Sequence, residues 1–220
     1  IMVFNQPVVD GAIEIERAVS YGPGWLVVYR QEEDEQRPGN IIGWTALEDG
    51  INQRVVVTLT QSALTAQLYL ALHEDTGEVG EFGFPVTDPP VRVDGRLPNP
   101  ALLETTPGSY LITEDQALSS SGTISIPLVV VDEPVWVVVE TAPAEEQGTI
   151  IGRTWVPAGV NHDVVVAVNA TETPLAVAAA LHRDAGTALV FDFPDGPDTA
   201  LQRNLGPIRA PFDILEADEE

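Results

Sequence analysis

Short hydrophobic runs recur along the whole chain, and many of their residues are β-branched. Residues 12–19 (AIEIERAV) alternate between apolar and polar positions with a period of two, which is typical of a strand with one buried face. The runs GWLVVY (24–29) and VWVVVE (135–140) are nearly continuous, as in strands that are covered on both faces. Gly, Pro, Asn and Asp separate the runs. The pattern therefore predicts an all-β protein.

The runs also set the expected strands. In the first half of the chain we predict strands at residues 2–5, 12–19, 25–30, 41–47, 54–60, 67–73, 81–85 and 91–93. In the second half we predict strands at residues 110–114, 123–131, 135–140, 149–156, 163–169, 175–182, 189–193 and 207–215.

The chain contains one module twice. Residues 41–85 align with residues 150–194 at a constant offset of 109, with 17 identities in 45 positions. Upstream the offset is 111, so that Trp25 aligns with Trp136. The difference of two residues falls within 30–40, where a surface loop can absorb it.

The repeat predicts two domains. Each copy has about 105–110 residues, which is enough for a core of its own. The number of short strands in each copy is typical of an immunoglobulin-like β-sandwich. We therefore predict two tandem immunoglobulin-like sandwiches at residues 1–107 and 108–220, joined within the Pro-rich stretch 98–110.

One segment, residues 61–73 (QSALTAQLYLALH), has a composition that also suits a helix. Its counterpart in the second copy has Pro174 at the position of Thr65. A proline inside a helix costs about 3 kcal/mol, so we predict a loop followed by a strand.

Composition excludes several classes of function. The chain has 34 acidic residues against 10 basic ones, all Arg, and a net charge of −24. Such a charge opposes binding to nucleic acid and to anionic membranes, but it permits divalent cations such as Ca²⁺. The absence of Cys excludes disulfides, thiol catalysis and zinc–thiolate sites. No hydrophobic run approaches the roughly 18 residues of a membrane span, so we expect no membrane insertion.

The order of motifs F-x-Q, DG-x-I-x-I, GW-x-V-V, IIG-x-T, LH-x-D-x-G and F-x-FP resembles an uncharacterised immunoglobulin-like domain. That domain recurs, often in tandem, in secreted and surface proteins of haloarchaea and of some bacteria, Chloroflexi among them. In the first copy the pattern comprises Phe4, Gln6, Asp10, Gly11, Gly24, Trp25, Ile42, Gly43, Asn52, His73, Asp75, Gly77, Phe82 and Phe84. In the second copy it comprises Gln116, Gly122, Trp136, Ile151, Gly152, Asn161, His182, Asp184, Gly186, Phe191 and Phe193.

The second copy departs from this pattern at Asp115 and Val135, where Phe4 and Gly24 stand in the first copy. The resemblance implies an exported β-sandwich, located outside the cell or at its surface. It implies no particular activity.

Two His–Asp pairs are the strongest candidates for chemistry, because they occupy the same place in both copies. His73 and Asp75, like His182 and Asp184, are two residues apart, so on a strand they share a face and could reach one metal ion. The chain has three His residues, so a site with two His in one copy would need His162. The alternative is a His at a strand end, hydrogen-bonded to an Asp that begins a tight turn. We favour this structural role and predict no metal site.

Asp75-Thr76-Gly77 also matches the tripeptide of aspartic proteases, which share a proton between one Asp from each of two lobes. Charged residues precede the motif here, and Ala185 replaces the hydroxyl residue in the second copy. We therefore predict no catalytic residues and no enzymatic activity.

The remaining candidates lie in loops and on aromatic residues. The acidic stretches 31–39 and 143–148 could bind Ca²⁺, although a solvated loop is the simpler interpretation. Asn169-Ala170-Thr171 is a glycosylation sequon. Trp25 and Trp136 are expected in the core. Trp44 and Trp155 lie one register apart in equivalent strands, so we expect them to face differently and one of them to lie at an interface.

The sequence favours a non-enzymatic structural protein of the cell surface, a tandem building block or spacer that assembles through strand or edge contacts into a filament or layer. Its expected partners are other copies of itself or other surface proteins. The N-terminal run IMVF (1–4) is the candidate for strand exchange between copies, unless it pairs within its own domain. A binding module that holds Ca²⁺, a glycan or a protein on its loops is the alternative.

Overall fold

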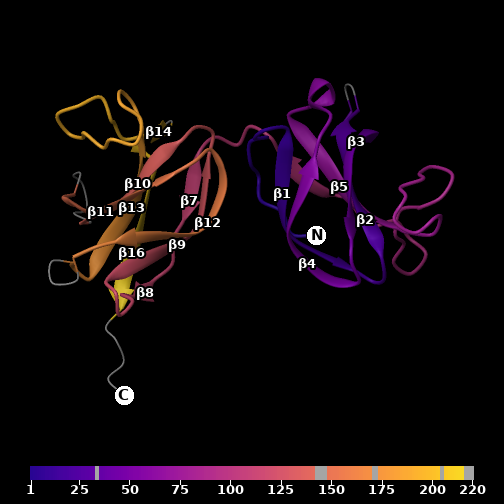
Figure 1. The fold of residues 1–220 in the computed structure, drawn as a ribbon, viewed down its shortest axis with the longest axis horizontal. Helices are drawn as coiled ribbons and strands as arrows, with labels where there is room; N and C mark the ends of the chain where they lie inside the picture. The colour runs from indigo at the N-terminus through magenta and orange to yellow at the C-terminus, as the bar shows by residue number, and fades with distance from the viewer. Residues whose placement is uncertain (33–34, 142–147, 170–172, 204–205, 216–220) are drawn as a thin grey trace, which may run out of the picture. The chain divides into compact units, whose positions relative to one another are not determined.

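The computed structural model describes residues 1–32, 35–141, 148–169, 173–203 and 206–215, and it contains two compact units (Figure 1). Unit 1 covers Ile1–Pro107 and unit 2 covers Gly108–Glu220. Both are β-sandwiches, so the all-β, immunoglobulin-like class is confirmed. In the described part of the chain, no helix has the length and hydrophobicity that crossing a membrane requires.

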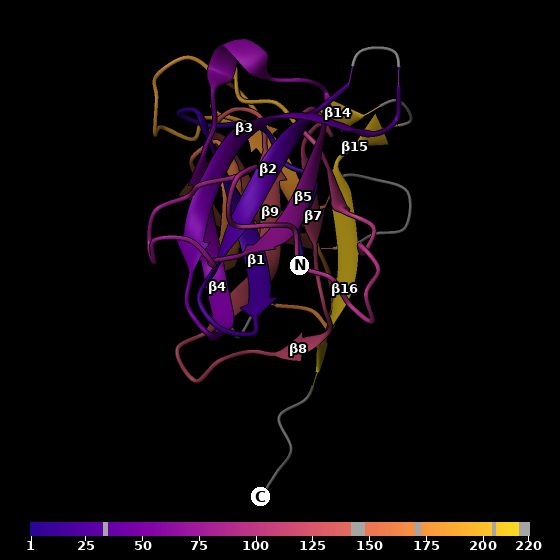
Figure 2. The same ribbon diagram turned by 90° about the vertical axis from the view of Figure 1, so that its right-hand side faces the viewer.

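Unit 1 consists of two sheets. The first pairs β1 (Ala12–Ser20) with β4 (Gly50–Thr58), and the second has the order β3-β2-β5-β6. The strands of the second sheet are β2 (Gly24–Gln31), β3 (Pro38–Leu47), β5 (Gln67–Glu74) and β6 (Ala101–Glu104). A 3-10 turn, η1 (Gln61–Ala63), lies at one end of the unit (Figures 1 and 2). A turn followed by β5 confirms the prediction of a loop and a strand over 61–73.

Unit 2 repeats this arrangement. Its sheets have the orders β12-β9-β7 and β11-β10-β13-β16-β8, with a small extra pair, β14-β15. The strands are β7 (Tyr110–Ile112), β8 (Gln116–Ala117), β9 (Thr123–Val131), β10 (Val135–Thr141), β11 (Ile150–Val156), β12 (Gly159–Ala167), β13 (Ala176–Arg183), β14 (Gln202–Arg203), β15 (Gly206–Pro207) and β16 (Arg209–Leu215).

Each unit has a separate hydrophobic core between its sheets. Ile13 and Ile15 of β1 face Leu26 and Val28 of β2 in unit 1. Ile124 and Ile126 of β9 play the same part in unit 2. The alternation of the first strand and the continuous run of the second thus meet in one core, as their patterns predict.

A glutamine, buried in unit 1 and half-buried in unit 2, secures the segment before the first long strand of each unit. The side chain of Gln6 accepts a hydrogen bond from the Glu14 N–H at 2.8 Å and donates one to the Glu14 carbonyl at 2.6 Å. Gln116 makes the same two contacts with Ser125, each at 2.8 Å. A side-chain amide that imitates a backbone partner in this way satisfies strand groups that would otherwise be unpaired.

The sheet edges approach each other at the glycine of the IIG motif. A Cβ atom on Gly43 would lie 2.5 Å from the carbonyl oxygen of Thr58, and one on Gly152 would lie 2.4 Å from that of Ala167. No side chain fits at these distances, which explains why the motif needs glycine.

Several predicted strand positions were wrong. Residues 81–85 and 189–193 lie in irregular and turn segments of the long loops, and 91–93 forms no regular strand. The aromatic residues that suggested strands there pack onto the sheet from the loop instead. β6 lies within 98–110, which we predicted to be linker, because its short apolar run ALL pairs with β5.

Candidate functional site

One His and two Asp residues that recur in both units lie where β5 and β13 end and a long loop begins. In unit 1 this loop covers residues 75–100. His73 on β5 and His182 on β13 are both only 1% exposed. Each loop folds back onto its own strand, since His73 forms a bridge with Pro90 and His182 forms one with Ala200. The repeated His residues therefore lie under the loop and away from solvent.

Both ring nitrogens of His73 have hydrogen-bond partners. Its Nδ1 lies 2.7 Å from the carbonyl oxygen of Asp88, and its Nε2 lies 2.6 Å from the hydroxyl of Tyr29. A carbonyl can only accept, so Nδ1 carries the proton, and in the neutral ring Nε2 accepts from the Tyr29 hydroxyl. Burial lowers the pKa of His73 and raises the pKa of Tyr29 to about 12, which favours the neutral form of both groups.

Asp88 organises the loop of unit 1. Its fully buried carboxylate accepts backbone hydrogen bonds from Gly83 at 2.7 Å, Thr76 at 2.9 Å and Gly77 at 3.1 Å. These bonds, that from Gly83 above all, lower the pKa of Asp88 although burial opposes them. Asp88 is therefore a charged anchor around which the loop winds, and its contacts are all internal.

Aromatic side chains cover the His–Asp cluster of unit 1. Phe82 and Phe84 meet the His73 ring edge to face, with ring centroids 5.9 and 5.1 Å away. Phe82 also contacts Trp25 at 5.4 Å. The FxFP motif thus closes the loop over the histidine, which explains why phenylalanines recur in a loop.

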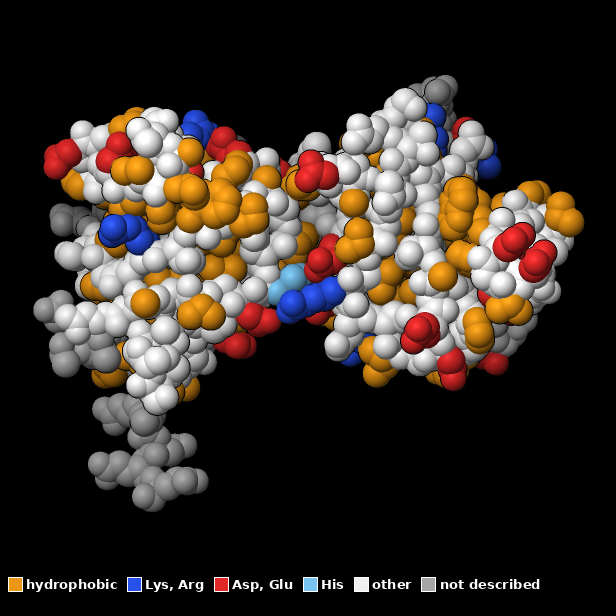
Figure 3. Space-filling model, viewed as in Figure 1, with side chains coloured by type: hydrophobic (Ala, Val, Ile, Leu, Met, Phe, Trp, Pro, Cys, Tyr) orange, Lys and Arg blue, Asp and Glu red, His pale blue; other side chains and the backbone are white. Residues whose placement is uncertain are grey.

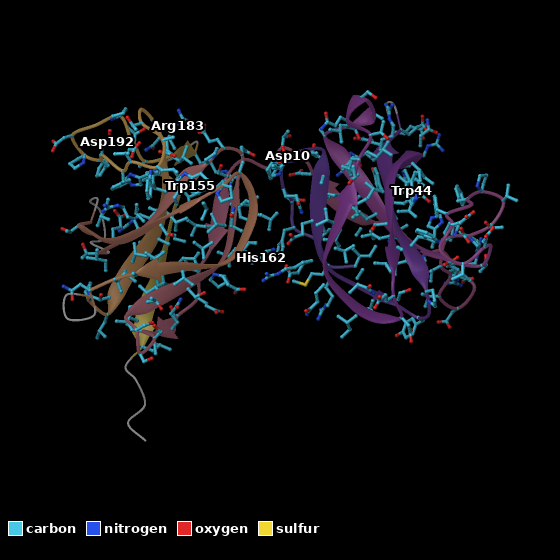
Figure 4. The ribbon with its side chains drawn as sticks, viewed as in Figure 1. Asp10, Trp44, Trp155, His162, Arg183 and Asp192 are labelled. Atoms are coloured by element: carbon cyan, nitrogen blue, oxygen red, sulfur yellow. The ribbon has the colours of Figure 1, made fainter. Side chains whose placement is uncertain are left out.

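Unit 2 repeats the carboxylate anchor. Asp198 is fully buried and accepts hydrogen bonds from Ala185 N–H at 2.8 Å and from Asp192 N–H at 3.1 Å. The side chain of Asp192 returns a contact by accepting from the Asp198 N–H at 3.2 Å. Figure 4 shows Asp192 on this loop.

The histidine of unit 2 differs from that of unit 1. Neither ring nitrogen of His182 has a hydrogen-bond partner among the described residues. Glu140 occupies the place of Tyr29, and it pairs with Arg209, whose Nε lies 2.5 Å from Glu140 Oε1. Burial lowers the pKa of His182, so the ring is neutral and packs between Phe191 and Phe193.

The two aspartates that we considered as metal ligands serve the loops. Asp75 accepts a hydrogen bond from Gly80 N–H at 2.9 Å. Asp184 accepts from the indole N–H groups of Trp136 at 3.3 Å and Trp155 at 2.9 Å. Within the described ranges, no group of three or more His, Asp or Glu residues is placed to hold a metal ion.

The expected structural role of the His–Asp pairs is therefore partly right. Asp75 holds the turn that follows it, but the carbonyl bonded to His73 belongs to Asp88. His162 lies on β12, in the other sheet from His182. Thr76, the middle residue of the tripeptide that matches aspartic proteases, accepts a hydrogen bond from the Asp88 N–H through its hydroxyl at 3.2 Å.

The expectation that Trp44 and Trp155 face different sides of their sheets was wrong. Trp44 pairs with Val27 across β3 and β2, whereas Trp155 pairs with Trp136 across β11 and β10. In the frame of the repeat, the two indoles stand two residues apart, because Trp155 aligns with Ala46. Positions two apart share a face of a strand, so both indoles lie on the side of the long loop.

Three other candidates lie partly outside the described residues. These are the acidic stretch 31–39, its counterpart 143–148 and the sequon that begins at Asn169. Of the acidic stretch, Arg37 and Glu35 form an exposed ion pair.

The repeated frame agrees with the comparison with known families. A domain of unknown function, DUF7282, matches residues 1–99 and again residues 110–210. The chain belongs to the DUF7282 family. No curated protein matches the sequence.

One similar solved structure is the crystal structure of CBD12 from CALX1.2. It is 10% identical, with 81% of this chain and 76% of that chain covered, at a TM-score of 0.26. With so low a score, the similarity carries no argument about function.

Two features of these DUF7282 domains were missed in the sequence. Asp88 and Asp198 lie just beyond the segment that aligns at a constant offset, and one extra residue in the second loop moves the offset to 110. Extending the alignment with a gap after the FxFP motif would have paired them. The Glu140–Arg209 pair has no counterpart in the first domain, so the repeat could not signal it.

The second DUF7282 domain also contains an open groove of about 610 Å³. It lies between β7 and the start of β16, and its lining includes Tyr110, Pro207, Ile208 and Arg209. Arg209 is already paired with Glu140, and Arg203 also lines the groove.

Proposed function

We propose that this chain is a non-enzymatic structural protein of the cell surface or the extracellular space. In this proposal each sandwich is a rigid building block, and copies of the chain associate through sheet edges into a filament or layer.

The fate of the repeated polar residues carries the proposal. His73, Asp88 and Asp198 are buried, and their hydrogen bonds go to groups of their own unit. A catalytic group needs contact with a substrate, whereas these groups hold a loop against a sheet. The residues common to both units therefore support the fold, as expected of a building block.

The charge of the chain determines the conditions under which copies can associate. A net charge of −24 keeps neighbouring molecules apart at low ionic strength. Salt screens such repulsion, and divalent cations can bridge carboxylates of neighbouring molecules. We therefore expect association to strengthen with salt or Ca²⁺ and to weaken with a chelator.

Negative-stain electron microscopy of the purified chain, first with Ca²⁺ and then with EDTA, tests the assembly. Ordered filaments or sheets in Ca²⁺ support the proposal. Isolated particles in both buffers and at high salt, at the highest soluble concentration, would contradict it.

The N-terminal run needs a separate test, because Met2 pairs with Arg17 of its own unit through two backbone hydrogen bonds of 2.7 and 3.1 Å. Deleting residues 1–9 would also remove the buried Gln6 and so damage unit 1. A disulfide between Met2→Cys and Arg17→Cys suits the spacing of such a pair and holds the run in place. If strand exchange joins copies, the oxidised variant stays monomeric and reduction restores assembly. Assembly of the oxidised variant would exclude exchange of this strand.

A further inference from the structure

We propose that unit 1 carries a binding site for neutral saccharides on the exposed surface formed by Trp44, Ala46 and Phe82, next to Trp25 and Asp75. This inference goes beyond the structural function, since a surface building block can fail to assemble and still bind a sugar.

The site begins with an aromatic platform. Trp44 is 50% exposed and stacks on Phe82, with ring centroids 5.1 Å apart and an angle of 28° between the planes. Figure 4 shows Trp44 on the side of unit 1 that carries the long loop, and Figure 3 shows hydrophobic atoms at the surface between sheet and loop. The two stacked rings form one aromatic face, and Trp residues with a partly exposed ring are enriched at binding surfaces.

A comparison of the two units shows what is missing beside this platform. In unit 2, Trp155 stands at the position of Ala46, and its indole N–H donates to Asp184 Oδ2 at 2.9 Å. The indole of Trp136 donates to the other oxygen of Asp184 at 3.3 Å. In unit 2 an indole ring therefore occupies the position of Ala46, and both carboxylate oxygens of Asp184 accept a hydrogen bond from an indole.

Unit 1 leaves the same place open. Ala46, which stands at the position of Trp155, is exposed and carries only a methyl group. Among the described residues, the indole nitrogen of Trp25 and Oδ1 of Asp75 have no hydrogen-bond partner. These atoms correspond to a pair that is bonded in unit 2. One unpaired donor and one unpaired acceptor, both shielded from solvent, thus lie beneath the aromatic surface that Phe82 and Trp44 form.

The chemistry of these groups selects the ligand. A hydroxyl group can accept from the Trp25 N–H and donate to Asp75, whereas a second indole could only donate. A pyranose ring offers such hydroxyls at its edge and a flat face of C–H groups that packs on an indole. The acidic surface repels anionic ligands, so a neutral sugar fits better than an acidic one. Both polar atoms are shielded from solvent, so binding must shift the loop edge and change the surroundings of Trp25.

The experiment uses intrinsic fluorescence of the full chain, which contains four Trp residues. The probes are neutral oligomers of β-1,4-glucose, α-1,4-glucose, mannose and N-acetylglucosamine. We expect one of these oligomers to bind with a saturable change and one site per chain. Trp44→Ala should weaken binding at least about tenfold, the size expected for removal of a central Trp.

Two variants separate binding from folding. Ala46→Trp gives unit 1 the ring that already fills unit 2, so it should keep the fold and abolish binding. The double variant Arg153→Trp/Trp155→Ala opens unit 2 in the same way and should raise the stoichiometry to two. Failure of all four oligomers to bind, or unchanged binding by Ala46→Trp, would overturn the proposal. Loss of self-association by Ala46→Trp without any sugar binding would show a protein interface instead.

Discussion

The hydroxyl of Tyr29 donates a hydrogen bond to Nε2 of His73 over 2.6 Å and so links neighbouring strands beneath the long loop of unit 1. The equivalent positions in unit 2 are Glu140 and His182, and they are not joined. Glu140 turns to Arg209, and the His182 ring remains without polar partners among the described residues. Both histidines are thus packed by two phenylalanines, but only His73 also has hydrogen-bond partners among the described residues.

Replacing Tyr29 with Phe should lower the stability of unit 1 by about 1–3 kcal/mol, because it leaves Nε2 of His73 buried without a partner. Calorimetry or urea unfolding of the full chain measures the change. Tyr21→Phe is the matched control, since Tyr21 is 98% exposed and should tolerate the change within about 0.5 kcal/mol. Equal effects of the two variants would show that the Tyr29–His73 bond contributes nothing.

Both buried histidines should make stability fall on mild acidification. Burial lowers the pKa of His73 and His182 in the folded chain, whereas an unfolded His titrates near about 6.5. Below that pH the unfolded state binds more protons, so stability is complete above about pH 7 and decreases toward pH 5. Urea unfolding measured between pH 7.5 and pH 5 tests this slope.

Phenylalanine substitutions distinguish the two histidines. His182→Phe should reduce the pH dependence of the stability of unit 2 with little loss of stability at pH 7.5. No hydrogen bond to a described residue is removed, and the new ring would pack against Phe191 and Phe193 as the imidazole does. His73→Phe should reduce the pH dependence of the stability of unit 1, but it should also lower that stability at pH 7.5. The reason is that the Tyr29 hydroxyl and the Asp88 carbonyl lose their hydrogen-bond partner. Equal cost at pH 7.5 would refute the difference between the two rings.

Removing one partner of the buried ion pair should be severe. Arg209→Met leaves the Glu140 carboxylate, 3% exposed, without its cation, and should destabilise unit 2 by about 3–5 kcal/mol. The control is Arg183→Met, which breaks an exposed pair with Glu133 and should cost less than about 1 kcal/mol. The double variant Glu140→Leu/Arg209→Met should recover much of the loss, as thermal unfolding would show. If it remains as unstable as Arg209→Met, the unpaired charge is not the cause.

An added methyl group at the close approach of the sheet edges should also destabilise. Gly152→Ala places Cβ against the Ala167 carbonyl, and Gly43→Ala places it against that of Thr58. Overpacking of this kind costs about 1–3 kcal/mol, and each variant should lower the melting temperature of its own unit. The exposed Glu48→Ala in the same region of unit 1 should leave it unchanged. Unchanged melting temperatures of both glycine variants would mean that the sheet edges can move apart at little cost to make room for the methyl group.

Much of the fold could be predicted from hydrophobic spacing, because strands record burial at every second residue. β9 spans the predicted 123–131, and β1, β2 and β5 agree within about two residues, the usual uncertainty of element ends. The errors cluster in the loops, where Phe82, Phe84, Phe191 and Phe193 imitate strand residues. These rings are apolar because they cover a buried histidine, and a pattern of hydrophobicity does not say which layer buries a residue.

For the candidate site, the repeat correctly drew attention to His73 and His182, yet their partners were hidden. Asp88 lies 15 residues from His73, and Glu140 lies 69 residues from Arg209, so folding alone brings each pair together. Likewise, the sequence contains both Trp44 and Ala46, but only the packed loop shows that one is an open platform and the other an unfilled place. The sequence by itself determined two β-sandwiches of one family and a strongly acidic surface, because these follow from local spacing and from sums over residues. The tertiary structure decided which polar groups are satisfied and which are not, because hydrogen bonding depends on distances between residues that are remote in the chain.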